Sequence, residues 1–334
     1  MGFDAIILAG DSAGSRKVKG ENKALLEIGG VSLVAHVLRA LQEVSRIDGI
    51  YIVGPKVRLE KALQKSQVLS QTTKLREIID QKRSFYQNVW RGIQCVFGTK
   101  NLDRLPSSSP ARDKAILIVP GDIPLLIPEE VDEFLNQCAL DRYDYFIGLT
   151  RQEYLEPYYP SHDLPGIRMS YFAFREGYFR INNLHLVKPL QIRNRRFVNK
   201  VYQYRYQRHP VNILYSTWEL LRLPSSLRAL ATYGLMQLSR VLMRMSLKRL
   251  SLYTRRLVSL RSLEEYAGRV LGARLASVET TFGGAALDVD NERDFLIISQ
   301  MFSRWRDFQL SLREKKMPGK ASGRTGGDVA VGVA

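Results

Sequence analysis

The sequence predicts an α/β fold with a mostly parallel, twisted sheet and flanking helices. Strand-like and helix-like segments alternate through residues 1–150, which is typical of right-handed β-α-β crossovers. Two continuous apolar runs, at residues 5–9 and 115–119, are rich in Ile, Leu and Val, as expected of strands buried on both faces. With 334 residues, the chain can form one large domain with an insertion or two domains.

Each element is predicted from apolar periodicity and from the turn residues beside it. In the first 150 residues we expect strands at 5–9, 49–54, 115–119 and 145–150, and helices at 31–45, 84–96 and 129–140. Residues 168–173 and 180–187 alternate as antiparallel or edge strands do. The last helix is expected at 291–305, and the chain beyond Lys315 is too polar and glycine-rich to order.

A loop of small residues follows the first strand. Gly10, Gly14 and Ser15 allow backbone N–H groups to approach a polyphosphate closely. Arg16 then offers a planar guanidinium and Lys23 a compact ammonium. The spacing matches neither a Walker P-loop nor a dinucleotide fingerprint. We therefore expect a triphosphate site, with an ordinary strand-loop-helix turn and two solvated cations as the alternative.

Carboxylates follow two later segments. Asp122 comes directly after the strand at 115–119, at the sheet edge where α/β proteins bind ligands. Asp288 and Asp290 lie in a turn near the C-terminus. One or two carboxylates, completed by phosphate oxygens and water, suit Mg²⁺. Helix capping is the alternative for Asp122 and for Asp290.

Together, these segments resemble the MobA-like NTP transferases, which are nucleotidyltransferases with a GT-A-like fold of the nucleotide-diphospho-sugar transferase type. Residues 8–23 are similar to the family's Leu-Ala-Gly-Gly-x-Gly-Thr-Arg…Lys opening, residues 121–125 to its Gly-Asp-x-Pro-Leu segment, and residues 288–294 to its Asp-Ile-Asp-Thr-Pro-Glu-Asp-Leu segment. Three departures are visible. Asp11 replaces the family's second glycine, the loop before Arg16 carries an extra residue, and the stretch from Arg16 to Lys23 is longer than in the shortest family members.

The resemblance implies a role for each matching residue. Arg16 and Lys23 would be catalytic, and Asp122 with Asp290 or Asp288 would bind Mg²⁺, with Asp290 preferred. The nucleotide-binding set would be Leu8, Ala9, Gly10, Gly14, Ser15, Ser84 and Asn88. The last two lie where family members often carry residues near base and ribose, and a capped amphipathic helix is the alternative there.

The positive charge of the chain is concentrated in residues 190–261. This region holds fifteen Lys or Arg and one acid, Glu219, which leaves +14 of the chain's +17. It fits a helical insertion with a solvated cationic face, or a surface that contacts anionic membrane lipid. Nucleic-acid binding is the least supported alternative, because the sequence contains no recognised RNA- or DNA-binding module.

Several function classes are excluded by composition. Two cysteines, Cys95 and Cys138, are too few for a disulfide framework, and the four histidines lack metal-ligand spacing. We see no secretory signal and no run of eighteen apolar residues. We therefore expect a cytoplasmic protein, with contact to the inner face of the membrane through residues 190–261 as an alternative.

The expected organisation is a nucleotidyltransferase core at 1–150 and 275–312, an acceptor-side region with the basic helical insertion at 151–274, and a disordered tail at 313–334. The expected reaction is Mg²⁺-dependent transfer of NMP from an NTP, CTP or GTP, to a phosphorylated small-molecule acceptor with release of pyrophosphate. Two alternatives stay open. One is an inactive nucleotide-binding protein on the same fold, and the other is a glycosyltransferase that uses a nucleotide-sugar donor.

Overall fold

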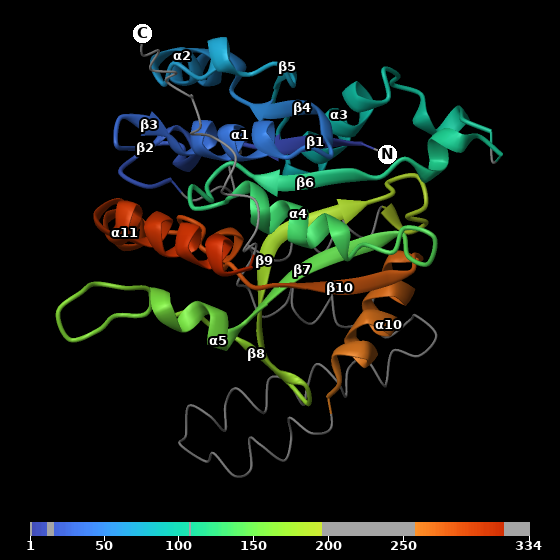
Figure 1. Ribbon diagram of the computed structural model, residues 1–334. Coiled ribbons are helices and arrows are strands. Elements are labelled where there is room, and N and C mark those ends of the chain that lie inside the picture. The colour runs from blue at the N-terminus through green and yellow to red at the C-terminus, as the bar shows by residue number, and fades with distance from the viewer. Residues whose placement is uncertain (1, 12–16, 107, 196–257, 317–334) are drawn as a thin grey trace, which may run out of the picture.

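A mixed sheet runs through the centre of the protein (Figure 1). The computed structural model describes residues 2–11, 17–106, 108–195 and 258–316. In this part of the chain the sheet is 8-stranded, in the order β10-β7-β9-β6-β1-β4-β5, and β8 pairs with β9. All neighbouring pairs are parallel except those made by β9, which runs antiparallel to its neighbours. The predicted fold class, α/β with a mostly parallel sheet, is confirmed.

The elements follow one another along the chain in alternation. The strands are β1 (Phe3–Leu8), β2 (Glu27–Ile28), β3 (Val31–Ser32), β4 (Ile47–Gly54), β5 (Leu75–Asp80), β6 (Ile116–Pro120), β7 (Tyr145–Arg151), β8 (Phe172–Phe174), β9 (Gly177–Val187) and β10 (Leu275–Thr280). The helices are α1 (Leu33–Glu43), α2 (Lys56–Lys65), α3 (Phe85–Val96), α4 (Pro128–Asn136), α5 (Gln152–Leu155), α10 (Leu260–Leu271) and α11 (Glu292–Lys316). Short 3₁₀ turns lie at η1 (Lys23–Leu25), η2 (Leu69–Gln71), η3 (Leu102–Arg104), η4 (Pro110–Asp113), η5 (Glu156–Tyr158) and η6 (Gly284–Ala286).

Helices cover both faces of the sheet, which explains the continuous apolar runs. Successive side chains of β1 point to opposite faces: Ile7 packs with residues of α1 and α4, whereas Ile6 packs with Ile93 of α3. Both isoleucines are fully buried. Because β7 and β10 run in the same direction as β1, β4 and β6, their carboxyl ends meet at one edge of the sheet.

The structure differs from the sequence expectations in several elements. Of the two alternatives for residues 180–187, the antiparallel strand is confirmed and the edge position is not, because β9 lies between β6 and β7. Strands β5 and β10 and the β2–β3 hairpin were not predicted. Helix α4 ends at Asn136, and α11 continues past Trp305 to Lys316, so residues 313–316 of the expected tail are helical.

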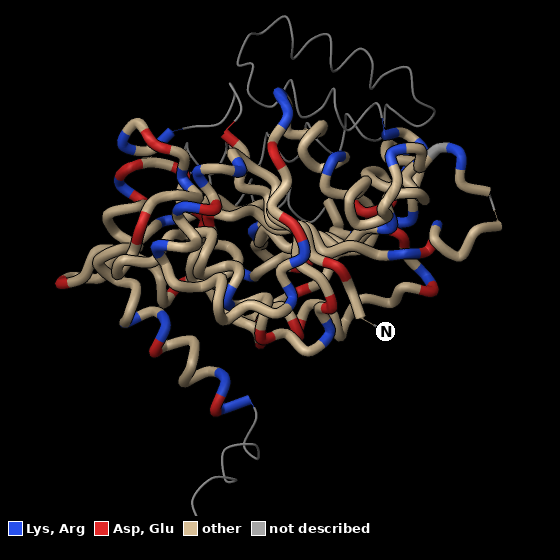
Figure 2. Tube along the Cα trace, turned by 90° about the horizontal axis from the view of Figure 1, so that it is seen from above, with Lys and Arg blue, Asp and Glu red and all other residues tan. Residues whose placement is uncertain are grey.

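Basic and acidic residues are interspersed along the described chain (Figure 2). The charge concentration at 190–261 lies mainly in residues 196–257, outside the described residues, so the expected helical insertion and membrane surface stay predictions. None of the helices among the described residues has the length and apolarity needed to cross a bilayer.

His36 of α1 is enclosed between the β2–β3 hairpin and α11. Its Nε2 lies 3.2 Å from the carbonyl oxygen of Ile28, so the neutral ring donates this hydrogen bond, and its ring is 4.7 Å from that of Phe302. The pKa of His36 is lowered to about 4, mainly by burial and also by the nearby Arg306 and Arg39, whereas the Ile28 hydrogen bond opposes this shift.

Acidification is therefore expected to weaken the fold at this point. Between pH 6.5 and 4 the unfolded chain binds a proton at His36 that the folded chain does not. The free energy of unfolding therefore decreases as the pH is lowered, and at pH 5 it is about 2 kcal/mol below its value at neutral pH. His36→Gln keeps a donor for Ile28 and removes the titration. Urea unfolding of both proteins at pH 7.5 and pH 5 should show the variant gaining relative stability at pH 5. If the two proteins differ in stability by the same amount at both pH values, the lowered pKa of His36 is contradicted.

Candidate active site

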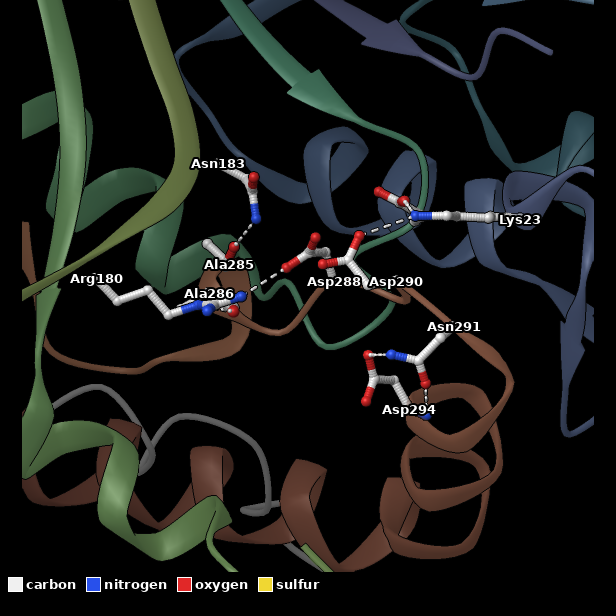
Figure 3. A network of polar contacts seen from close by, with 10 residues as sticks. Lys23, Arg180, Asn183, Ala285, Ala286, Asp288, Asp290, Asn291 and Asp294 are labelled. Carbon is white, nitrogen blue, oxygen red and sulfur yellow. Dashed lines mark hydrogen bonds and ion pairs between the residues drawn. The ribbon is translucent and has the colours of Figure 1, made fainter. Parts of the chain in front are cut away.

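Three side chains from distant parts of the sequence meet at the carboxyl edge of the sheet. The Lys23 ammonium lies 3.4 Å from Asp122 Oδ2 and 3.1 Å from Asp290 Oδ1, and Figure 3 shows Lys23 and Asp290 directed toward each other. Lys23 opens η1, Asp122 follows β6, and Asp290 precedes α11. Of the predicted catalytic and metal residues, the structure thus brings these three together.

Burial and mutual charge set the protonation of this group. Burial lowers the pKa of Lys23, but Asp122 and Asp290 outweigh it, so the pKa is raised overall and the ammonium stays protonated. Burial raises the pKa of Asp122 to about 6 against the opposing effect of Lys23. The side chain of Asp122 is 18% exposed and that of Asp290 48%. The site therefore holds one half-buried and one more accessible carboxylate around a single cation.

The turn between β10 and Asp290 is held by β9 (Figure 3). Arg180 donates to the carbonyl oxygen of Ala286 at 2.9 Å and to Asp288 Oδ1 at 3.0 Å. Asn183 Nδ2 donates to the carbonyl oxygen of Ala285 at 3.0 Å. The φ of Asn183 is 63°, a left-handed value that is uncommon outside glycine and for which asparagine is enriched. Asp288 is thus paired with Arg180, while Asp290 reaches Lys23.

The same turn is held from α4 by Glu130, which is fully buried. Its carboxylate accepts from the Ala285 N–H at 2.9 Å and from Thr280 Oγ1 at 3.1 Å, and burial raises its pKa to about 7. Glu130 does not touch the Lys23 group. Its contacts position the turn that carries the two carboxylates.

The predicted nucleotide loop begins as expected and then leaves the described residues. Leu8 ends β1, and the carbonyl oxygen of Ala9 accepts from Asn22 Nδ2 at 2.9 Å. Asn22 also caps η1 through the Ala24 N–H at 3.0 Å, so one side chain fixes Lys23 relative to β1. Gly14, Ser15 and Arg16 fall outside the described residues, and their roles stay predictions.

Gly10 allows α3 to approach the loop closely. A Cβ on Gly10 would lie 2.8 Å from Asn88 Nδ2, too close for any other residue without a shift. Asn88 is buried and accepts from the Lys82 N–H at 2.5 Å. Ser84 forms a capping box with Gln87 at the start of α3. The predicted capped helix is therefore present, and it places Asn88 beside Gly10 as the binding hypothesis requires.

Asp11, a departure from the family motif, forms an ion pair with Arg58 of α2. Arg58 Nη1 lies 3.2 Å from Asp11 Oδ2, and the same guanidinium contacts Glu21. The Asp11 N–H donates to Gln81 Oε1 at 2.6 Å. The side chain of Asp11 is 13% exposed. The extra carboxylate is therefore turned into an ion pair, which reduces its repulsion of a triphosphate.

Removing Arg58 is expected to weaken nucleotide binding. In Arg58→Gln the Asp11 carboxylate would face a triphosphate uncompensated, and we expect the KM for NTP to rise about fivefold. Asp11→Gly in the same background should restore most of the loss, whereas Lys65→Gln at the other end of α2 should change little. Steady-state kinetics of the four proteins provide the measurement, and failure of the double variant to recover would contradict the pairing.

The donor set fits Mg²⁺ that is brought with a polyphosphate. In the described part of the chain, no three His, Cys, Asp or Glu side chains converge as a ready-made metal site. Asp122 and Asp290 do converge on one positive charge, that of Lys23. Mg²⁺ commonly takes one or two protein carboxylates and completes its coordination with substrate phosphates and water. These two residues would therefore hold the ion.

Sequence reasoning missed four residues that arrange this site: Arg58, Asn22, Arg180 and Glu130. Each acts through a contact to a distant segment, and neither spacing nor periodicity carries a signal for such contacts. Asn22 alone had a local signal, because an asparagine directly before a helical turn is typical of an N-cap.

Comparison with known proteins identifies the family. The model of the MobA-like NTP transferase domain matches residues 5–243. This chain therefore belongs to the MobA-like NTP transferase family, which confirms the predicted resemblance and places it in the nucleotidyltransferase class of enzymes. The match ends before Asp288 and Asp290, so their place at the site comes from the structure.

Individual relatives cover only part of the chain. A 2-C-methyl-D-erythritol 4-phosphate cytidylyltransferase from Pelodictyon phaeoclathratiforme is 32% identical over 129 residues, 38% of this chain and 50% of that protein. The protein of that name from Chlorobaculum tepidum is 27% identical over 138 residues, 40% and 52% respectively. The chain thus spans about half the length of these curated relatives.

A solved structure matches over a larger share. A hypothetical transferase from Thermus thermophilus has a TM-score of 0.57 at 22% identity and covers 88% of this chain and 99% of its own. At this identity, the likeness supports the fold.

Proposed function

We propose that this protein is a Mg²⁺-dependent nucleotidyltransferase that transfers NMP from an NTP to a phosphorylated acceptor. The observation that carries the proposal is the convergence of Lys23, Asp122 and Asp290 at the carboxyl edge of the sheet. An acceptor oxygen attacks the α-phosphorus in line, the bond to the bridging oxygen of the β-phosphate breaks, and pyrophosphate leaves. Such transfer depends on positioning and electrostatic stabilisation.

The chain's own residues have separate tasks in this proposal. The Lys23 ammonium binds phosphate oxygens and offsets the negative charge that develops on them. Asp122 and Asp290 hold Mg²⁺, which when bound neutralises phosphate charge and orients the reacting groups. The backbone at Leu8, Ala9 and Gly10 borders the base, with Ser84 and Asn88 near it. Arg16 joins Lys23 on the triphosphate.

CTP is the nucleotide favoured by the relatives. The curated relatives are named cytidylyltransferases and act on 2-C-methyl-D-erythritol 4-phosphate, whereas GTP remains the alternative within the family. A polyol phosphate is therefore one acceptor class to test.

An inactive nucleotide-binding protein is less favoured than this enzyme. That alternative depends on Asp11 as a carboxylate beside the triphosphate, and its ion pair with Arg58 weakens that ground. The glycosyltransferase alternative is less favoured too, because the family model that matches is that of NTP transferases.

The test is pyrophosphate release with each of the four NTPs, Mg²⁺ and grouped phosphorylated acceptors. We expect turnover with CTP above the other three, lost on chelation with EDTA and restored by excess Mg²⁺. Nucleotide binding without pyrophosphate release for any acceptor group would overturn the proposed reaction and favour the inactive protein.

A further inference from the structure

A pocket of about 390 Å³ opens beside the proposed catalytic site, between α3 and β9. Leu8 and Pro120, at the carboxyl ends of β1 and β6, line the pocket, and Pro120 is two residues from Asp122. Asn183 lines it as well, and its amide holds the turn that leads to Asp290. The pocket therefore reaches the carboxyl edge of the sheet, where the reaction would occur, and it has the size of small-molecule sites.

The floor of the pocket is formed by the sheet. Ile118 of β6 pairs with His185 of β9, and Val187 follows on the same face because strand side chains alternate. The polar groups of this floor already bond to each other, since Tyr145 Oη lies 3.1 Å from His185 Nδ1. The floor thus offers mainly apolar surface.

Aromatic and aliphatic side chains form the walls. On α3, the ring of Trp90 is stacked with that of Tyr86, with centroids 6.5 Å apart, and the Arg195 guanidinium lies 5.0 Å from the Trp90 ring centroid. These two contacts fix the orientation of Trp90 between an aromatic and a cationic neighbour. Ile192 and Leu271 also line the pocket.

We propose that this pocket binds an apolar group, alkyl or aromatic, that is attached to the phosphate of the acceptor. The inference rests on the proposed function, because the acceptor's phosphate must reach the Lys23 group. The apolar lining is the reason for the chemical class. Buried apolar carbons gain free energy in such a pocket, whereas the hydroxyls of a polyol would lose water there without matching partners. The acceptor class therefore differs from the polyol phosphate that the relatives' names suggest.

The test measures binding along a series of acceptor analogues. Isothermal titration of the full chain in Mg²⁺ buffer would use methyl, propyl, pentyl and phenyl phosphate, with glycerol phosphate as the polar comparison. We expect affinity to rise about threefold for each added methylene, because each one buries further apolar surface. Glycerol phosphate should bind no more tightly than methyl phosphate.

Two variants of lining residues test whether the dependence of affinity on chain length arises in this pocket. Leu271→Trp at the end of α10 should fill the pocket and abolish the dependence of affinity on chain length. Leu310→Trp, at an exposed position of α11, is the matched control and should preserve that dependence. Trp90→Leu should reduce the preference for phenyl phosphate at least threefold even where Leu271→Trp fails to fold. Equal affinity for all the alkyl phosphates in the unmodified chain would overturn the inference. So would a trend that survives both pocket variants.

The failure of this inference is distinguishable from that of the proposed function. Binding that depends on chain length, without pyrophosphate release from any NTP, would support the apolar acceptor pocket and contradict the proposed reaction. Pyrophosphate release with polyol phosphates, together with equal affinity for all the alkyl phosphates, would support the proposed reaction and contradict the apolar acceptor.

Discussion

Asp122→Asn is expected to lower pyrophosphate release by about 10²-fold or more while the protein stays folded. The substitution removes a half-buried negative charge that lies 3.4 Å from the Lys23 ammonium and is proposed to hold Mg²⁺. An amide of the same shape still fills the position, and Lys23 keeps Asp290 as its partner. We therefore expect turnover to decrease and the Mg²⁺ concentration needed for half-maximal rate to increase.

Thermal unfolding and pyrophosphate release of the purified variant provide the measurement. Asp163→Asn is a suitable control, because that carboxylate is 95% exposed and far from the site in sequence, and it should retain normal activity. Near-normal turnover of Asp122→Asn, with an acceptor that the unmodified chain uses, would remove Asp122 from the proposed metal site. Loss of the unfolding transition would instead assign it a structural role.

The central strands were predictable because they are buried on both faces. The runs at β1 and β6 are continuously apolar, and few structures other than a covered parallel sheet use such runs. Strand β5, Leu-Arg-Glu-Ile-Ile-Asp, was missed because it lies at the end of the sheet and carries exposed charges. Strand β10, Leu-Ala-Ser-Val-Glu-Thr, lacks a continuous apolar run for the same physical reason.

Strand β9 is the antiparallel strand that the sequence offered as one alternative for residues 180–187, and it lies inside the sheet. Its polar residues Arg180, Asn182, Asn183 and His185 are typical of an edge, yet each is engaged within the fold. Asn182 is buried and donates to Thr150 and Thr280, whereas Arg180 and Asn183 hold the 285–288 turn. A central strand can carry such residues when neighbouring strands and the turn at the site supply their partners: Asn182 and His185 bond to neighbouring strands, and Arg180 and Asn183 to the turn.

The charged residues of the candidate site were easier to predict from the sequence than the residues that hold them in position. The rule that ligands bind at the carboxyl ends of parallel strands places Asp122 near the end of β1, and the chemistry of Lys23 suits the same ligand. No local signal shows that Arg58 pairs with Asp11 or that Glu130 holds Ala285. Those contacts join segments far apart in sequence, and only the folded chain brings them together.

Asp290→Asn is expected to lower turnover by about 10²-fold, whereas Asp288→Asn should lower it only about tenfold. The two carboxylates are two residues apart, but their partners differ. Asp290 is 48% exposed and contacts Lys23 beside Asp122, so it can reach an incoming ion. Asp288 is 19% exposed and its charge is already matched by Arg180, so its main task is to position the turn.

A double-mutant cycle separates these tasks. If Arg180 acts on the reaction through Asp288, Arg180→Met combined with Asp288→Asn should cost no more than the more damaging single change. If Asp290 holds the ion, Asp290→Asn should also raise the Mn²⁺ dissociation constant measured with CTP by paramagnetic resonance, whereas Arg180→Met should leave that constant within about twofold. A larger loss of turnover and of Mn²⁺ affinity in Asp288→Asn would reverse the assignment. Asp288 would then be the metal ligand, and Arg180 would have to release it when the nucleotide binds.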